Sequence, residues 1–208
     1  MTVEEFQEFV LTHCRALGVE YEASKERAVQ FEGAYCSGYF ADEHSGGPKL
    51  AYATGKPSKD WFIILVHEYN HMLQWSQKDP LWKLVQESDK YLWRWIGGEI
   101  ELEHERAKKY VMANLRVELD CERRTLKMCG MLDLPIDPEW YVKKANSYVY
   151  FYHMVLKHRK WYEVGREPYS VPEIVSAMPD TLDGDYETIS EELVNLYETH
   201  LEYLCAPE

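Results

Sequence analysis

Residues 61–71 read WFIILVHEYNH, six apolar residues followed by a pentapeptide that begins and ends with histidine. The apolar run alone is compatible with a buried strand, but its continuation favours a helix from Trp61 to about Gln77. The first turns of this helix are apolar on every side, which is typical of a buried helix. We therefore expect it to carry His67 and His71 into the interior.

The pentapeptide His67–His71 is an instance of the HExxH pattern. Four residues advance a helix by about 400°, so His67 and His71 project from one face and can reach the same ion. Glu68 points beside that ion, as a carboxylate must if it is to take a proton from metal-bound water without binding the metal. Two buried histidines one turn apart need hydrogen-bond or metal partners. The pattern favours Zn²⁺ as cofactor over two hydrogen-bonded core histidines.

A hydrolytic zinc site needs a third protein ligand besides an open position for water. One known extension of the motif places a glycine three residues and a histidine six residues after the second histidine. Gln74 and Gln77 stand at these positions. The third ligand must therefore come from another segment.

The helix expected from Glu99 to Met128 offers two carboxylates. Glu118 and Glu122 fall on or next to its inward face, which is set by Val111, Leu115, Leu119 and Leu126. Because their spacing of four puts both on one side of the helix, we expect Glu118 to bind the metal and Glu122 to hydrogen-bond a ligand histidine. The alternative is a pair of solvated glutamates, since most glutamates are exposed.

Three other residues of this helix carry possible ligand atoms. His104 lies two heptads before Glu118, on nearly the same face. Asp120 is turned by about 200° from Glu118, so we expect it to be solvated. Cys121 can approach a metal from the third position after Glu118, although small buried cysteines more often belong to the core.

The pentapeptide HEYNH, followed after a long gap by ELDCE at residues 118–122, resembles the gluzincin group of zinc metallopeptidases. The order of hairpin, HExxH helix and glutamate helix is similar to that of small gluzincin-like and ImmA/IrrE-like peptidases, over about residues 33–128. The resemblance implies a zincin-like core that holds Zn²⁺. Its implied ligands are His67, His71 and Glu118, with Glu68 as general base and Glu122 as hydrogen-bond partner of a ligand histidine.

The chain departs from the family pattern at two points. Glu122 occupies the position where the family has aspartate, and the gap between the second histidine and Glu118 is longer than in thermolysin-like members. The assignment of roles between Glu118 and Glu122 is therefore open.

The function implied by the resemblance is that of a zinc-dependent metallopeptidase, which hydrolyses peptide bonds of a protein or peptide substrate through a metal-activated water. The expected strand Lys49–Thr54 is a candidate edge for pairing with an extended peptide. An ordinary hairpin that covers the HExxH helix is the alternative. The competing function is that of a binding or regulatory protein, zinc-containing or metal-free, without hydrolytic activity.

A peptidase also needs a hydrogen-bond donor for the negative charge that develops on the substrate carbonyl oxygen. Tyr148, Tyr152 and His153 are the candidates, and we select Tyr152 as the catalytic donor. The alternative is that these side chains are packing aromatics of a core helix.

The remaining patterns predict an α+β fold that is predominantly helical, with one small antiparallel sheet packed on the HExxH helix. A Gly-rich turn joins the two expected strands, Gly33–Phe40 and Lys49–Thr54. Further helices are expected at 2–18, 24–31, 81–95, 99–128 and 140–163, and from Thr188 through Leu204. The pairs Thr2 with Glu5 and Thr188 with Glu191 have the spacing of a capping box at the start of the first and last helices. Ser58 or Asp60 is the expected cap of the helix that begins at Trp61.

Length and composition favour one domain over residues 1–208, with a core at about 33–128 and a C-terminal helical part at about 138–208. The chain has 208 residues, of which 46% are hydrophobic and 28% charged, as in ordinary globular domains. Its net charge of −13 disfavours nucleic acid and anionic lipid as partners. The stretch 180–208 contains no lysine or arginine, so it is a possible dock for a basic protein.

Three observations suggest a cytoplasmic protein. The longest apolar run, Trp61–Val66, is far too short to span a membrane. The N-terminal sequence lacks the basic and apolar regions of an export signal. The five cysteines form no CxxC pair, which favours reduced thiols over a disulfide framework.

Overall fold

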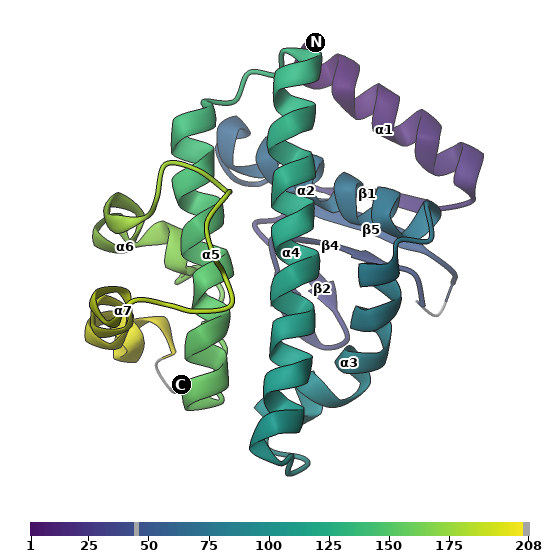
Figure 1. Ribbon diagram of the computed structural model, residues 1–208. Helices are drawn as coiled ribbons and strands as arrows, with labels where there is room; N and C mark the ends of the chain where they lie inside the picture. The colour runs from purple at the N-terminus through teal and green to yellow at the C-terminus, as the bar shows by residue number, and fades with distance from the viewer. Residues whose placement is uncertain (44–45, 206–208) are drawn as a thin grey trace. The chain divides into compact units, whose positions relative to one another are not determined.

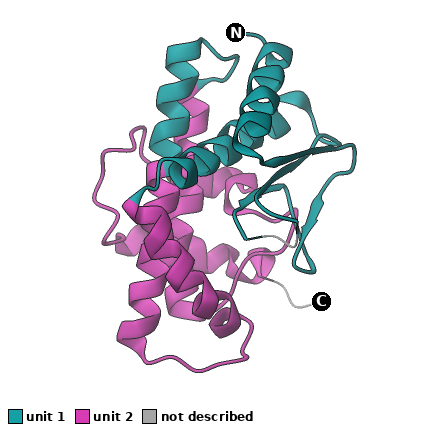
Figure 2. Cartoon of the chain, turned by 90° about the vertical axis from the view of Figure 1, so that its right-hand side faces the viewer, with its two compact units in different colours: residues 1–79, 121–137 teal, residues 80–120, 138–208 magenta. Residues whose placement is uncertain are grey.

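Helices make up most of the structure, a computed structural model that describes residues 1–43 and 46–205 (Figure 1). Two compact units can be distinguished: unit 1 comprises 1–79 and 121–137, and unit 2 comprises 80–120 and 138–208 (Figure 2). The long helix α4 (His104–Leu132) contributes to both units. An α+β class is thus confirmed, whereas the expectation of a single domain stays a prediction.

Unit 1 begins with helix α1 (Val3–Leu17), whose ends follow the sequence signals. Thr2 and Glu5 form the expected capping box. Gly18 ends the helix in the left-handed region, with φ at 68°, where glycine has no steric penalty. Phe6, Val10 and Cys14 are fully buried on one face of α1. This face contributes to the core of unit 1.

The main sheet of unit 1 has three strands in the order β1-β5-β4. Strand β5 (Lys49–Ala53) pairs in parallel with β1 (Glu20–Ser24) and in antiparallel orientation with β4 (Gly38–Ala41). The sheet is therefore mixed, not antiparallel throughout. The expected edge at Lys49–Thr54 is wrong, because β5 is the central strand. Residues 44–45, in the predicted Gly-rich turn, lie outside the described residues.

A separate antiparallel hairpin joins β2 (Val29–Phe31) to β3 (Ala34–Cys36). The predicted helix at 24–31 is therefore wrong, and the predicted strand at 33–40 is divided between this hairpin and β4. Glu32 and Gly33 turn the chain between the two strands with positive φ angles of 48° and 89°. This tight turn is incompatible with a continuing helix.

Helix α2 (Ser58–Ser76) contains the HEYNH pentapeptide and packs on β4 and β5. Pro57 precedes it without a side-chain cap, so the predicted cap at Ser58 or Asp60 is wrong. A close approach between sheet and helix occurs at Gly38. A Cβ atom there would lie 2.5 Å from Ile64 Cγ2 and 3.2 Å from Glu68 Cγ. Glycine thus allows β4 to pass directly over α2 at Glu68.

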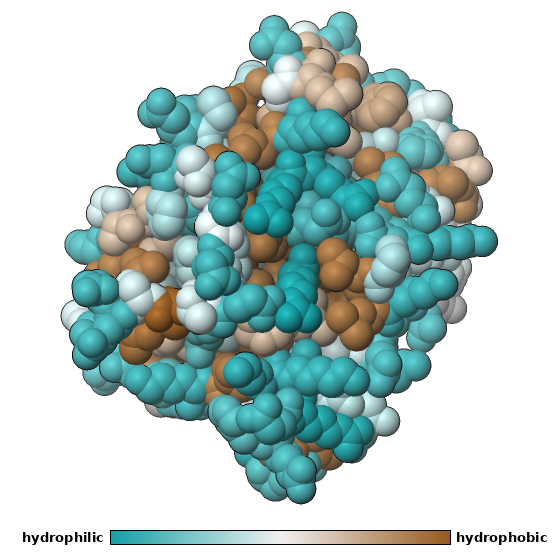
Figure 3. Space-filling view, in the orientation of Figure 1, coloured by the Kyte–Doolittle hydropathy of each residue, from teal (hydrophilic) through white to brown (hydrophobic). Residues whose placement is uncertain are grey.

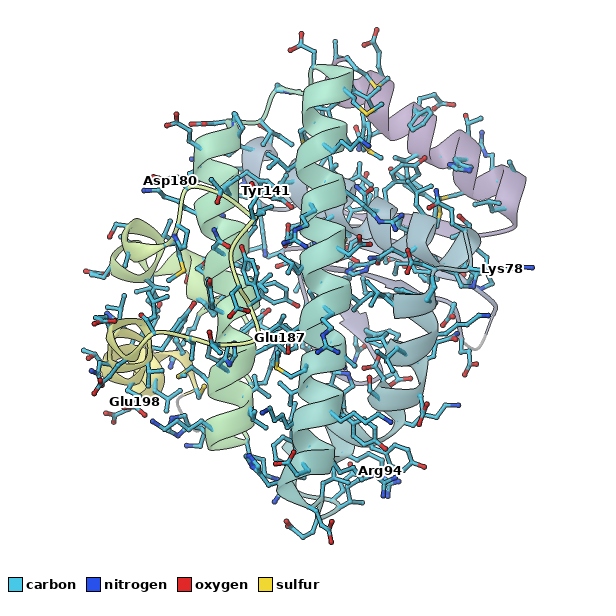
Figure 4. All side chains as sticks on the ribbon, viewed as in Figure 1. Lys78, Arg94, Tyr141, Asp180, Glu187 and Glu198 are labelled. Carbon is cyan, nitrogen blue, oxygen red and sulfur yellow. The ribbon has the colours of Figure 1, made fainter. Side chains whose placement is uncertain are left out.

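The C-terminal end of α2 is fixed by main-chain and side-chain bonds. Lys78 adopts the left-handed region, with φ at 57°, and the Asp79 amide donates to the Gln74 carbonyl at 2.9 Å. Arg124 of α4 donates to Gln77 Oε1 at 2.9 Å and pairs with Asp79 Oδ2 at 2.5 Å. The side chain of Lys78 extends away from the ribbon (Figure 4).

Unit 2 is built around helix α5 (Pro138–His158), whose apolar face is rich in aromatic residues. Helix α6 (Pro172–Ala177), the short 3-10 helix η1 (Pro168–Ser170) and α7 (Glu191–Leu204) all contact α5 (Figure 1). Helix α3 (Pro80–Ile96) agrees with the predicted helix at 81–95. The cap of α7 is Ser190, so the predicted cap at Thr188 is wrong, and Thr188 bonds to Asp185 instead.

The segment 179–187, which we call the strap, lies along α5 and is bound by buried polar groups. Asn146 donates through Nδ2 to the carbonyls of Pro179 (2.9 Å) and Thr181 (3.0 Å) and accepts a hydrogen bond from Tyr186. His153 Nε2 lies 3.1 Å from the Tyr186 carbonyl. Figure 4 labels the strap residues Asp180 and Glu187.

Within residues 1–43 and 46–205, no helix combines the length and apolar character needed to cross a bilayer. The face drawn in Figure 3 carries mainly hydrophilic residues, with hydrophobic ones in separate patches.

Candidate metal centre

The two histidines of HEYNH face each other inside unit 1. His67 and His71 lie one turn apart on α2, and their Nε2 atoms are 3.0 Å apart. With Zn–N distances of about 2.0–2.1 Å, two nitrogens on one tetrahedral ion lie roughly 3.3 Å apart. The observed separation is therefore close to that of two ligands of a single ion. His71 is buried and His67 is half-buried.

The Nδ1 atom of each histidine ring lies close to an oxygen acceptor. His71 Nδ1 is 2.8 Å from Gln74 Oε1, and His67 Nδ1 is 3.3 Å from Glu122 Oε1. Ring nitrogens that donate to such oxygens carry the proton, which leaves the Nε2 atom as the electron-pair donor. Two Nε2 lone pairs facing each other at 3.0 Å repel unless a cation or a proton lies between them. The donor set thus fits a metal ion.

Cys121 of α4 lies close to His67. Its Sγ is 3.7 Å from His67 Nδ1 and 3.3 Å from the His67 carbonyl oxygen. His67, His71 and Cys121 each offer a ligand atom within 4.8 Å of the others, so the thiol is a further candidate ligand. Cys121 and Glu122 both approach Nδ1 of His67.

Glu68 is buried, with 8% of its surface exposed, and lies below β4 at Gly38. Burial, and after it the negative charge of Glu68, raise the pKa of the Cys36 thiol on β3 to about 12. One residue after His67 on α2, Glu68 points beside the histidine pair and towards the sheet. The role of Glu68 as general base stays a prediction.

A second layer of polar side chains supports α2. Asn70, within the pentapeptide, is 1% exposed and donates through Nδ2 to the Val66 carbonyl (2.9 Å) and to Thr125 Oγ1 on α4 (3.2 Å). Thr125 is fully buried. These bonds fix the rotation of α2 relative to the 121–132 part of α4, and with it the direction in which the histidines point.

The predicted third ligand, Glu118, and the predicted oxyanion donor, Tyr152, belong to unit 2. Glu118 is half-buried in α4. Burial, and after it the negative charge of Glu118, raise the pKa of Tyr148 well above its usual value. Tyr152 is 1% exposed, and its hydroxyl lies 3.3 Å from that of Tyr148. The roles of Glu118 and Tyr152 stay predictions.

The other candidates of the sequence lie as follows. His104 is the exposed first residue of α4, and Asp120 is half-buried. His153 binds the strap, which gives it a structural partner in unit 2. Gln74, whose presence excludes the extended motif, contacts His71. Its position three residues after His71, on the buried face of α2, is the signal that predicts a contact with the histidine ring.

Comparison of the chain with protein-family models, curated proteins and solved structures finds no match.

Proposed function

We propose that the chain is a zinc-dependent metallopeptidase with a zincin-like core, which acts on a protein or peptide substrate in the cytoplasm. The observation that carries the proposal is the pair of Nε2 atoms 3.0 Å apart, each on a ring whose Nδ1 lies against an oxygen acceptor. Such a pair is typical of histidines that share a metal ion. His67 and His71 would hold Zn²⁺, with Glu118 as third ligand.

A zinc ion held there would supply Lewis-acid polarisation of the scissile carbonyl and of the attacking water. Glu68 accepts a proton from the attacking water at its carboxylate and delivers it to the nitrogen of the leaving amine. Glu122 holds the ring of His67 through Nδ1, and Gln74 holds that of His71. Tyr152 is retained as the proposed hydrogen-bond donor to the carbonyl oxygen.

We infer that an extended substrate pairs with β4 rather than with the central strand β5. Among the described residues, β4 pairs with β5 along one side and no strand pairs with its other side. It also passes over α2 at Glu68, because Gly38 has no side chain. A peptide that adds to β4 as a further strand would therefore run close to the proposed base.

The test is the metal content of the purified protein, measured by mass spectrometry without chelator, together with hydrolysis of a mixed peptide library. We expect about one zinc per chain in the wild type, loss of zinc in the His67→Ala and Glu118→Ala variants, and cleavage by the wild type alone. Cys121→Ser distinguishes a thiol ligand, since it keeps zinc if Glu118 is the third ligand. Zinc without cleavage of any peptide would support a binding protein instead.

A wild type that takes up no zinc, even after reconstitution, would overturn the proposal and favour a metal-free interaction protein.

A further inference from the structure

The side chain of Gln74 contacts the ring of His71 from within the same helix, α2. It is fully buried, and its Oε1 lies 2.8 Å from Nδ1 of His71, which is itself only 7% exposed. Burial of a long polar side chain costs free energy unless its polar atoms are bonded. The contact with His71 Nδ1 provides such a bond for the amide oxygen of Gln74.

We propose that Gln74 is a positioning residue that fixes the tautomer and the ring orientation of His71. The amide oxygen accepts the Nδ1 proton of His71, so the electron pair for a metal is confined to Nε2. This Nε2 atom is the one that faces His67 across 3.0 Å. The inference rests on the proposed function in one respect: the metal that His71 binds would be the zinc ion of the peptidase.

The two histidines thus obtain their acceptors from different sources. His67 relies on the carboxylate of Glu122, which comes from α4, a separate helix. His71 relies on a neutral amide three residues away on α2. Because residues three apart on a helix are neighbours, the bond between Gln74 and His71 needs no residue from another helix.

The bonds at the end of α2 hold the Gln74 backbone in place. The Gln74 carbonyl accepts the Asp79 amide at 2.9 Å, and Asp79 in turn pairs with Arg124. The helix thus remains regular through Gln74 and ends only at Ser76. This regularity keeps the three-residue spacing that the bond to His71 requires.

The first experiment uses ¹⁵N NMR of the histidine rings in the full chain without metal, where protonated and unprotonated ring nitrogens have well-separated shifts. We expect His71 in the wild type to carry its proton on Nδ1. In Gln74→Met, which keeps the volume but loses the amide oxygen, we expect a mixture of tautomers. Gln74→Glu, which keeps an oxygen acceptor, should restore the Nδ1 proton.

The second experiment measures zinc affinity by competition with a chelator. Loss of an outer hydrogen-bond partner of a metal-bound histidine typically lowers affinity by about 10–100-fold, so we expect this decrease in Gln74→Met and recovery in Gln74→Glu. Gln77→Met is the matched control, because Gln77 is exposed, bonds to Arg124 and lies one turn further along the chain. It should leave both the tautomer and the affinity unchanged.

An unchanged His71 tautomer in Gln74→Met, or a zinc affinity within twofold of the wild type, would overturn the inference while leaving the peptidase proposal intact. If the wild type binds no zinc, the peptidase proposal fails, and the tautomer result alone supports or overturns the role of Gln74. A Gln74→Met variant that fails to fold is replaced by Gln74→Leu, judged by the same two measurements.

Discussion

Buried polar side chains are bonded differently in the two units. In unit 2 most of them bind main-chain carbonyls: Asn146 binds those of Pro179 and Thr181, and the Tyr197 hydroxyl donates to that of Ser147 at 2.6 Å. In unit 1 the buried groups around His71 bind one another, through ring nitrogens, an amide oxygen and a carboxylate. The bonds to main-chain carbonyls fix the path of the chain in unit 2, whereas the bonds around His71 fix the orientation of side chains that carry candidate ligand atoms.

The largest effect is expected from Glu68→Gln. Loss of the proposed general base should lower peptide hydrolysis by about 10²–10⁴-fold, because general-base catalysis typically contributes that much. The zinc content should be unchanged, since Glu68 is not a proposed ligand. Turnover is measured on the peptides that the wild type cleaves, with Glu87→Gln on α3 as an exposed-helix control. Full activity in Glu68→Gln would remove Glu68 from the mechanism.

Asn146→Leu should cause the largest loss of stability in unit 2. It leaves the hydroxyl of Tyr186 and the carbonyls of Pro179 and Thr181 without their buried partner. We expect the free energy of unfolding to decrease by about 2–4 kcal/mol, as for several buried groups left unpaired. Urea unfolding measures this change, and zinc affinity should stay constant.

The control for Asn146 is Asn195→Leu on α7, where the side chain is exposed. A substitution of this kind typically changes stability by less than about 0.5 kcal/mol. An equally small change in Asn146→Leu would mean that the strap is not held by Asn146, and the comparison between the units would lose its main support.

A smaller effect on stability is expected when the pH is lowered, because His153 then takes up a proton. Burial lowers the pKa of His153 below its usual value, so the folded chain keeps the ring neutral while the unfolded chain protonates near pH 6.5. The stability of unit 2 should therefore be full above about pH 6.5 and should decrease as the pH falls from there through the lowered pKa. Protonation of the ring then favours unfolding.

Urea unfolding at a series of pH values tests this expectation with His153→Gln, which keeps a donor for the Tyr186 carbonyl but does not titrate. The variant should show a flatter stability profile between pH 7 and 5, at about the same values above pH 7. His200→Gln on α7 serves as control. An identical pH profile in His153→Gln and the wild type would contradict the prediction.

The smallest effect is expected from Lys78→Gly at the end of α2. Lys78 has a φ of 57°, a region that glycine occupies without steric cost. The substitution should therefore raise the free energy of unfolding by about 0.5–1 kcal/mol. Lys78→Ala, which keeps a Cβ atom, should give no such gain, and neither variant should alter zinc affinity. A destabilised Lys78→Gly would show that the lysine side chain has a role of its own.

The sequence predicted best the elements whose signals are local. The capping box of Thr2 marks the start of α1, and Gly18 marks its end. The apolar run at 61–66 indicated the buried helix α2. Spacing alone also predicted that the histidines of HEYNH face one another. In each of these cases the interacting residues lie within a few positions of one another.

The errors arose where pairing depends on distant residues. Strand β1 is half exposed and pairs in parallel with β5, which lies more than twenty residues later in the chain. A short-range sequence pattern therefore does not predict β1. Once β1 pairs there, β5 becomes central and cannot be the predicted edge. Glu122 lies against His67, as expected for a hydrogen-bond partner of a ligand histidine, and Cys121 beside it contacts the same ring.

Unit 1 consists of two separate stretches of chain, and this has a consequence for biosynthesis. A ribosome that has made residues 1–79 must still synthesise 80–120 before Cys121, Glu122 and Thr125 can join α2. At about 5–20 residues per second, completion through residue 137 follows roughly 3–12 s later. During that interval the nascent α2 lacks the part of its cover that residues 121–137 supply, and its apolar surface is exposed to solvent.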